Sequence, residues 1–113
     1  MLPKASRLFK KQDFKEVAKR GRAIHSTFLV FKKIPAGRPV PTLIGLVVSG
    51  KVSKKSTVRN KIRRRLREIL REQLGQIKPG YKVILVVKAT ILDKDFMAIK
   101  NDLKFLFKRA DLL

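Results

Sequence analysis

The sequence lacks cysteine and tryptophan, and it has one histidine and only eight acidic residues among its 113 positions. Without cysteine there is no disulfide framework, no thiolate metal site and no cysteine nucleophile. The acidic residues are scattered, so no carboxylate cluster is visible that could hold Mg²⁺ for a self-sufficient nuclease. His25 has no metal-ligating or nucleophilic neighbour in the sequence, and we expect it in a turn or at the surface. No phosphate-binding P-loop or dinucleotide fingerprint is present either.

Long hydrophobic runs are also missing. The longest apolar runs, residues 43–48 and 83–87, are far shorter than the ~20 residues that a membrane-spanning helix needs, and they are typical of buried strands. Residues 1–11 lack the apolar segment of a secretion signal. Together with the absence of cysteine, this pattern leads us to expect a cytoplasmic protein.

Positive charge is what the sequence has in excess. Lysine and arginine total 29 against 8 acidic residues, which gives a formal net charge of +21. The chain is nevertheless 44% hydrophobic, which is too apolar for a disordered polycation. We therefore expect one folded, strongly basic domain over residues 1–113. A charge of this size attracts nucleic acid or an anionic membrane surface.

Hydrophobic periodicity predicts three helices and three strands. Ser56 or Thr57 is the expected N-cap of the second helix, and Asp93 that of the third. The order helix, strands, helix, strand, helix implies an α/β domain with helices packed on a small sheet. The expected helices cover residues 11–20, 56–74 and 94–109, and the expected strands cover residues 27–33, 42–49 and 82–88.

The second helix carries a basic ridge. Asn60, Arg64, Arg67 and Arg71 follow i, i+4, i+7, i+11 spacing, opposite the apolar face, and form a ridge about 16 Å long. Basic residues are also ordinary on a solvated helix surface. Between residues 59 and 72, however, they outnumber glutamate seven to two, and such a self-repelling surface is costly unless a polyanion neutralises it. The preceding loop adds lysines and hydroxyl groups beside the positive end of the helix dipole, which is a suitable place for phosphate.

The aromatic residues of the first expected strand leave two interpretations open. Phe28 and Val30 point to one face, and Leu29 and Phe31 point to the other. The strand therefore lies between two layers or shows one apolar face to a ligand. An open face with an aromatic residue and flanking lysines is a platform on which single-stranded nucleic acid stacks.

The stretch from residue 48 to 68 resembles the signature of the bacterial ribonuclease P protein component. Its centre is Arg59-Asn60-Lys61, followed by the basic run over residues 63–67. The pattern extends to Asp13-Phe14 and to Arg20-Gly21-Arg22, so the resemblance covers essentially the whole chain. It implies an α/β sandwich of the ribosomal protein S5 domain 2-like type, with a left-handed βαβ crossover around the long helix. The expected order is α-β-β-(β)-α-β-α, in which a third strand before the long helix is optional.

The resemblance also implies a function. The family member is the protein subunit of a ribonucleoprotein whose RNA removes the 5′ leader from precursor tRNA by Mg²⁺-dependent hydrolysis. The expected partners are this catalytic RNA and precursor tRNA, with Mg²⁺ held mainly by the RNA. No catalytic residue, membrane contact or small-molecule substrate is expected for the protein. Its charge would reduce the repulsion between the two RNAs and the Mg²⁺ concentration needed for docking.

Site residues follow from the resemblance position by position. The expected contacts with the catalytic RNA are Lys51, Ser53, Lys54, Lys55, Arg59, Asn60, Lys61, Arg63, Arg64, Arg67 and Arg71. The expected leader cleft, between the first helix and the sheet, contains Phe14, Phe28, Phe31 and Lys33. Two positions depart from the family pattern: Gly50 replaces a common lysine, and Ala18 replaces a frequent second cleft phenylalanine.

Three other functions compete with this one. A ribosomal or other structural RNA-binding protein would share the fold and the charge, and it would differ in which RNA it binds. A DNA-binding protein would place the basic helix in a major groove and would prefer duplex DNA to structured RNA. The self-sufficient nuclease is disfavoured by the scattered carboxylates.

Overall fold

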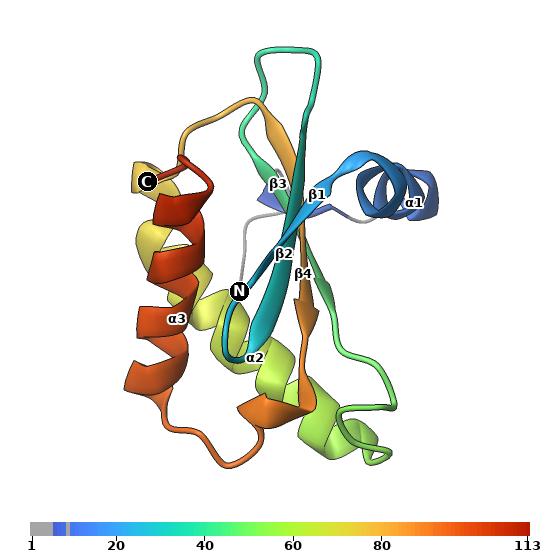
Figure 1. Ribbon diagram of the computed structural model, residues 1–113, viewed down its shortest axis with the longest axis vertical. Coiled ribbons are helices and arrows are strands. Elements are labelled where there is room, and N and C mark those ends of the chain that lie inside the picture. Colours follow the sequence, from blue (N-terminus) through green and yellow to red (C-terminus); the bar gives the residue numbers. More distant parts are fainter. Residues whose placement is uncertain (1–5, 9) are drawn as a thin grey trace.

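A four-stranded sheet with helices on both faces forms the protein (Figure 1). The computed structural model describes residues 6–8 and 10–113. Two short 3-10 turns, η2 (Leu74–Gln76) and η3 (Ala89–Ile91), accompany the main elements. The helices are α1 (Lys11–Arg20), α2 (Ser56–Gln73) and α3 (Phe96–Arg109), and the strands are β1 (Arg22–His25), β2 (Leu29–Pro35), β3 (Leu43–Val47) and β4 (Tyr81–Val87).

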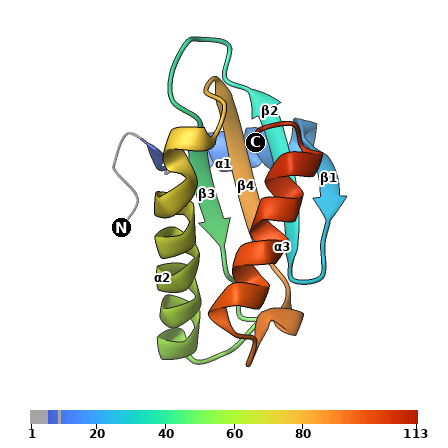
Figure 2. The same cartoon turned by 90° about the vertical axis from the view of Figure 1, so that its left-hand side faces the viewer.

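The strand order is β1-β2-β4-β3. β1 pairs with β2, and β2 with β4, in antiparallel fashion, whereas β3 and β4 are parallel. The parallel pair is connected through α2. In Figure 2 both strands run downward, α2 lies in front of them, and the chain passes from β3 on the left to β4 on the right, which makes the crossover left-handed. Such crossovers are almost always right-handed, so the expected unusual connection is present.

Two hydrophobic cores lie on the two faces of the sheet. On one face, α2 and α3 bury Leu66, Ile69 and Phe107 against strand residues. On the other face, α1 contributes the fully buried Val17, which packs with Ile84. α1 covers only part of its face, and the uncovered part is important for the site described below.

Most predicted elements are present, with shifted ends. The prediction for residues 11–20 matches α1, and each of the three predicted strands is found within two residues of its expected ends. The short edge strand β1 is the further strand that the expected order allowed before the long helix, although periodicity did not locate its four residues. All helices described in residues 6–8 and 10–113 are too short or too polar to cross a membrane.

Both predicted helix caps are wrong. Asp95, not Asp93, accepts a hydrogen bond from the Ala98 N–H at 2.8 Å and begins α3. Asp93 instead takes a positive φ of 62° in the preceding turn. The N-cap position of α2 is Lys55, which makes no side-chain capping bond, and Ser56 already lies inside the helix.

Candidate RNA-binding surfaces

Asn60, Arg64, Arg67 and Arg71 form a basic ridge along α2, called the α2 ridge. Asn60, Arg64 and Arg71 are exposed and Arg67 is half-buried, while Leu66, Ile69 and Leu70 of the same helix are completely buried. The apolar residues thus fix the rotation of α2 on the sheet. Consequently the ridge faces solvent along more than two helical turns.

Two arginines beside the ridge hold the preceding loop against α2. The Arg59 guanidinium donates to the Ser53 carbonyl at 2.9 Å. Arg63 donates to the Val48 carbonyl at 3.3 Å and to the Asn60 side-chain oxygen at 2.9 Å. Hydrogen bonds to charged donors are stronger than neutral ones, so these contacts give the loop a defined position. Arg59 and Arg63 therefore shape the basic surface in addition to adding charge to it.

The loop from residue 49 to 55 brings its lysines to the beginning of α2. Lys51, Lys54 and Lys55 are exposed, and Val52 is buried and anchors the loop in the core. The Ser53 hydroxyl accepts from the Lys55 N–H at 3.2 Å. Because no side chain caps α2, the N–H groups of its first turn lie beside these lysines, an arrangement that suits phosphate. Lys61 is exposed farther along α2 and lines a pocket between α2 and α3. Arg65 lines the same pocket and donates to the Lys94 carbonyl at 3.3 Å.

A second surface lies on the sheet face that α1 partly covers. Across the four strands, His25 pairs with Val30, Val30 with Val86, and Val47 with Val86. The three valines are half-buried and His25 is exposed. We call these four residues the valine row. α1 covers the neighbouring rows around Ile84 and leaves the valine row open.

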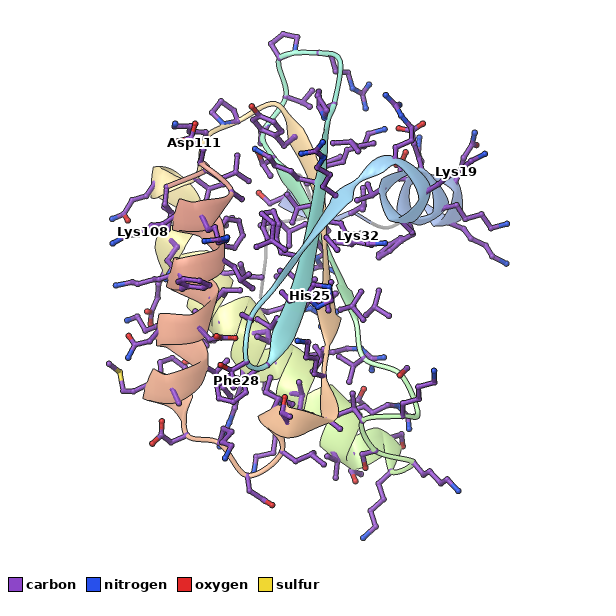
Figure 3. All side chains as sticks on the ribbon, in the orientation of Figure 1. Lys19, His25, Phe28, Lys32, Lys108 and Asp111 are labelled. Atoms are coloured by element: carbon purple, nitrogen blue, oxygen red, sulfur yellow. The ribbon has the colours of Figure 1, made fainter. Side chains whose placement is uncertain are left out.

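Three of the four expected cleft residues do not face this surface. Phe31 is completely buried on the opposite face, where its ring meets the ring of Phe107 edge-on, with centroids 5.2 Å apart. Phe28 is 8% exposed, belongs to the same core and points toward α3 in Figure 3. Lys33 also lies on that side, donates to the Ala110 carbonyl at 2.6 Å and lies 4.6 Å from the centre of the Tyr81 ring. The physical reason is that α3 covers the β2 face that carries Leu29, Phe31 and Lys33, so the expected open face is a core face.

Phe14 lies on the expected side. It is half-buried in α1 and packs against the core beneath that helix. Its ring lies over Gly45 of β3, where a Cβ atom would overlap the ring. Among the described residues, Phe14 is the aromatic residue packed on this face, and Ala18, one turn later, is exposed.

Sequence reasoning missed two lysines that dock α1. Lys82 of β4 is 14% exposed, and its ammonium lies 3.0 Å from the Asp13 carboxylate and 3.6 Å from that of Glu16. Lys32 of β2 donates to the Ala18 carbonyl at 3.0 Å. Figure 3 shows Lys32 directed toward α1, whereas Phe28, which directly precedes β2, is directed toward α3. The signal in the sequence was the alternation of Lys32, Ile34 and Val30, but alternation alone does not say which face is covered.

The chain also matches a known family over almost its whole length. The family model described as Ribonuclease P matches residues 2–111. The chain belongs to the ribonuclease P protein family. The resemblance seen in the sequence is thereby confirmed.

Relatives and solved structures agree with this assignment. The ribonuclease P protein component of Pseudanabaena sp. (strain PCC 6903) is 34% identical over 113 residues, covering 100% of this chain and 97% of the relative. That of Synechococcus sp. (strain JA-3-3Ab) is 38% identical over 116 residues, covering 100% and 92%. The RNase P protein of Thermotoga maritima superposes with a TM-score of 0.82 at 29% identity, covering 91% of this chain and 96% of that one. A mutant Staphylococcus aureus RNase P protein with defective mRNA degradation activity gives 0.89 at 25% identity, covering 97% and 92%.

The family establishes what kind of protein this is. Ribonuclease P protein components are subunits of an endoribonuclease holoenzyme, and the chain has the RNA-binding subunit role. The predicted fold class, function and enzyme class are therefore confirmed. The alternative of a ribosomal or other structural RNA-binding protein is not favoured.

The carboxylates of this ribonuclease P family member do not fit a divalent-cation site. Asp13 and Glu16 are paired with Lys82, and Glu72 is paired with Lys100 at 3.0 Å. Asp102 accepts from the Ser26 hydroxyl and the Phe28 N–H. Within residues 6–8 and 10–113, no three acidic or histidine side chains gather as a metal site would require.

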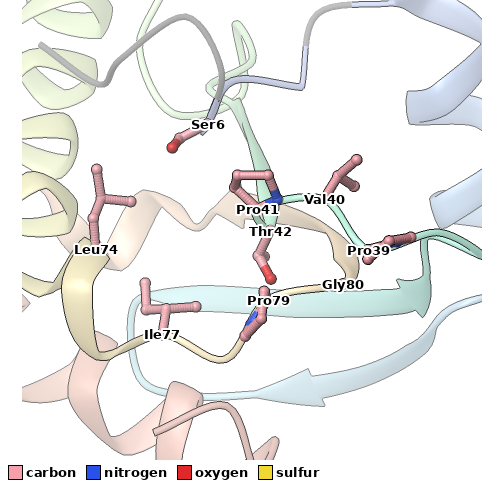
Figure 4. A pocket seen from close by; sticks show the side chains of 9 residues that line it. All are labelled: Ser6, Pro39, Val40, Pro41, Thr42, Leu74, Ile77, Pro79 and Gly80. Carbon is pink, nitrogen blue, oxygen red and sulfur yellow. The ribbon is translucent and has the colours of Figure 1, made fainter.

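A pocket of about 540 Å³ at one end of the sheet is also unsuited to RNA phosphate (Figure 4). Pro39, Pro41 and Pro79 line it together with aliphatic residues, and no described lysine or arginine does. Phosphate recognition needs cations or free N–H groups, and three prolines supply neither.

Proposed function

We propose that the chain binds the catalytic RNA of ribonuclease P through α2 and the loop before it, and that it binds the 5′ leader of precursor tRNA on the α1 face of the sheet. The first contact rests on the α2 ridge and on the loop that Arg59 and Arg63 hold in place. The second rests on the open valine row beside Phe14. The carrying observation is that the chain has two separate nucleic-acid-compatible surfaces, which a subunit between two RNAs requires.

The proposed contacts with the catalytic RNA are electrostatic. The arginines of the α2 ridge follow one another along the helix, which rises about 1.5 Å per residue, so they can contact several phosphates of one RNA backbone. Arginine also binds phosphate through two parallel N–H bonds, which orients the RNA. The residues proposed for this surface are Lys51, Ser53, Lys54, Lys55, Arg59, Asn60, Lys61, Arg63, Arg64, Arg67 and Arg71.

The proposed leader contact is mainly apolar and tolerant of sequence. Unpaired bases can lie on Phe14 and on the half-buried valines, because every base has an apolar face. Valine supplies van der Waals contact without aromatic stacking, so each base gains less than it would on a sheet rich in aromatic residues. Lys15 and Lys19 are exposed on α1 and supply charge for the leader phosphates. Of the residues expected from the sequence, Phe14 is retained here, and Val30, Val47 and Val86 replace Phe28, Phe31 and Lys33.

The hydrolysis itself is assigned to the RNA subunit. Since most of the described carboxylates are engaged by lysines or N–H groups, and no three of them gather in the described part of the chain, Mg²⁺ is proposed to be held by RNA and not by this chain. The protein lowers the repulsion between catalyst and substrate with its net charge of +21. We propose the cytoplasm, where precursor tRNA is made in bacteria, as the site of action.

The test is to purify the chain from its native cells at moderate salt and to sequence the RNA bound to it. The proposal expects one abundant structured RNA together with precursor tRNAs that keep their 5′ leaders. An Arg64→Gln, Arg67→Gln variant is the matched control and should lose the structured RNA. Recovery of ribosomal RNA alone, equally with both proteins, would contradict the proposal.

A further inference from the structure

A basic pocket of about 610 Å³ opens at the β1 edge of the sheet, where α1 and α3 end. Its cations come from four different elements: Arg20 from α1, Arg22 from β1, Lys33 from β2 and Arg109 from α3. We call it the β1-edge pocket. Figure 2 shows β1 at one side of the molecule and α2 at the other, so the pocket is separate from the α2 ridge. Strands lie about 4.8 Å apart, which puts β1 about 14 Å from β3 across the sheet.

The strand register brings two of these cations together. Arg22 is the direct partner of Lys33, and two residues later Ile24 is the partner of Phe31. Because strand residues alternate, Arg22 and Lys33 lie on the same side of the sheet as the Phe31 core, which is the side of α3. The Lys33 ammonium is fixed there by the Ala110 carbonyl at 2.6 Å, just after the end of α3. Thus Lys33 connects the end of α3 to the edge of the sheet and forms the rigid base of the pocket.

The charge of the pocket is not balanced by the protein. Four cations meet one lining carboxylate, Asp111, which pairs with Lys78 outside the pocket at 3.3 Å and is 87% exposed at its side chain. Arg20 approaches Glu16 at 3.9 Å, a long and exposed pair. Within the described part of the chain, the guanidinium groups of Arg22 and Arg109 form no hydrogen bond or ion pair. Cations at helix C-termini are favoured by the helix dipole, which accounts for Arg20 and Arg109 but not for Arg22 in a strand.

We propose that the β1-edge pocket binds the phosphate backbone of an RNA segment different from the segment on the α2 ridge. Two unpaired guanidinium groups beside a fixed ammonium can surround phosphate oxygens from several sides. Ile24 and Pro35 give the pocket an apolar wall that a ribose or base can contact. The inference rests on the proposed function, and it extends that function by making the chain a bridge between two RNA segments, one at the β1 edge of the sheet and one on α2 beside the opposite edge (Figure 2).

The first experiment measures RNA affinity against salt. Arg22→Gln with Arg109→Gln removes two pocket charges, and Arg38→Gln with Lys104→Gln removes two charges from exposed positions outside the pocket and the α2 ridge. Each protein is assembled with the catalytic RNA, and its Kd is measured from 50 to 200 mM salt. For the wild type, Kd rises by some factor between 50 and 200 mM salt, and loss of two phosphate contacts should make this factor about tenfold smaller. The control pair should change the factor far less. Equal effects of the two pairs would overturn the proposal, because the pocket would then contribute only its general charge.

The second experiment locates the RNA segment. The chain has no cysteine, so Arg22→Cys, Arg109→Cys and Arg64→Cys each provide one attachment point for a tethered iron–EDTA cleavage reagent. The proposal expects the first two variants to cleave one RNA segment and Arg64→Cys to cleave another. Cleavage of the same segment from all three, or none from the pocket, would contradict it and would leave an acidic protein as the occupant to test.

If the wild-type chain and the Arg64→Gln, Arg67→Gln variant bind the catalytic RNA equally weakly, the proposed function fails instead. Circular dichroism of every variant checks that it is folded.

Discussion

The ring of Phe14 in α1 lies against Gly45 in β3, in the space that any Cβ atom at position 45 would occupy. A side chain there would also come within 3.2 Å of the Leu8 Cβ. Glycine is thus required by the close approach of α1 and not by backbone conformation. The contact sets the height of α1 above the sheet and the position of Phe14 beside the valine row.

Gly45→Ala should therefore displace Phe14 and loosen α1. Overpacking of this kind should lower the unfolding free energy by about 1–3 kcal/mol. Urea denaturation of the variant and the wild type measures this loss. Binding of leader-bearing tRNA should weaken as well. Gly75→Ala is the control, because a Cβ there meets no atom within 4 Å, and its stability should stay within about 1 kcal/mol of the wild type. Equal stability of both variants would mean that α1 can move away from the sheet without a loss of unfolding free energy.

Lys82→Met tests how α1 is docked. Lys82, Asp13 and Glu16 form a mostly buried cluster with side-chain exposures of 14%, 21% and 38%. Removing the cation leaves two carboxylates side by side, so unfolding free energy should fall by about 2–4 kcal/mol, somewhat below the full cost of a buried pair. Lys78→Met removes a lysine paired with Asp111 at 55% and 87% exposure, and its cost should be below about 1 kcal/mol. Similar losses for both variants would refute a special role of Lys82.

Substitutions of Phe31 and Phe14 should have different effects, the first mainly on stability and the second mainly on leader binding. Phe31→Ala creates a cavity beside Phe107 and should cost about 3–5 kcal/mol in urea unfolding. Phe14→Ala should cost less, because Phe14 is half-buried, and should lower the affinity for precursor tRNA by about fivefold or more, given about 1–3 kcal/mol for stacking per base. Equilibrium binding with and without the leader measures this effect. A folded Phe31→Ala protein with a selective loss of leader affinity would show that Phe31 is not a core residue.

Arginines of α2 should differ in what they do. Arg64→Gln and Arg67→Gln each remove a contact from the α2 ridge and should reduce the salt slope of RNA binding by about 0.7–0.9. Arg63→Gln should in addition free the loop, because Arg63 holds the Val48 carbonyl. Hydrogen exchange of residues 49–55 in the protein alone measures the loop directly. Unchanged exchange in Arg63→Gln would show that the arginine acts by charge only.

The sequence was sufficient for the parts of the fold that depend on one element. Periodicity located α1 and α2, and the spacing of Asn60, Arg64, Arg67 and Arg71 was sufficient to place them on one side of α2. The resemblance supplied the left-handed crossover, which periodicity does not encode.

Predictions failed where the outcome depends on packing between elements. Both faces of β2 are apolar, and α3, which is 61 residues away in sequence, decides that Phe31 faces the core. The partner of Lys82 could not be predicted either, because Asp13 lies 69 residues away in sequence and reaches Lys82 only when α1 packs on the sheet. The N-cap of α3 is Asp95 and not the predicted Asp93, because Asp93 adopts the left-handed turn conformation before the helix.

The central claim is that this protein makes the holoenzyme prefer precursor tRNA through the leader. The direct measurement is the affinity of the catalytic RNA for one tRNA with and without its 5′ leader, each in the presence and absence of the chain at fixed salt and Mg²⁺. We predict that the chain raises the affinity for the leader-bearing tRNA more than for the mature tRNA, and that Phe14→Ala removes most of this difference. An equal gain for both tRNAs would contradict leader binding on the α1 face and would leave the chain as a general electrostatic bridge.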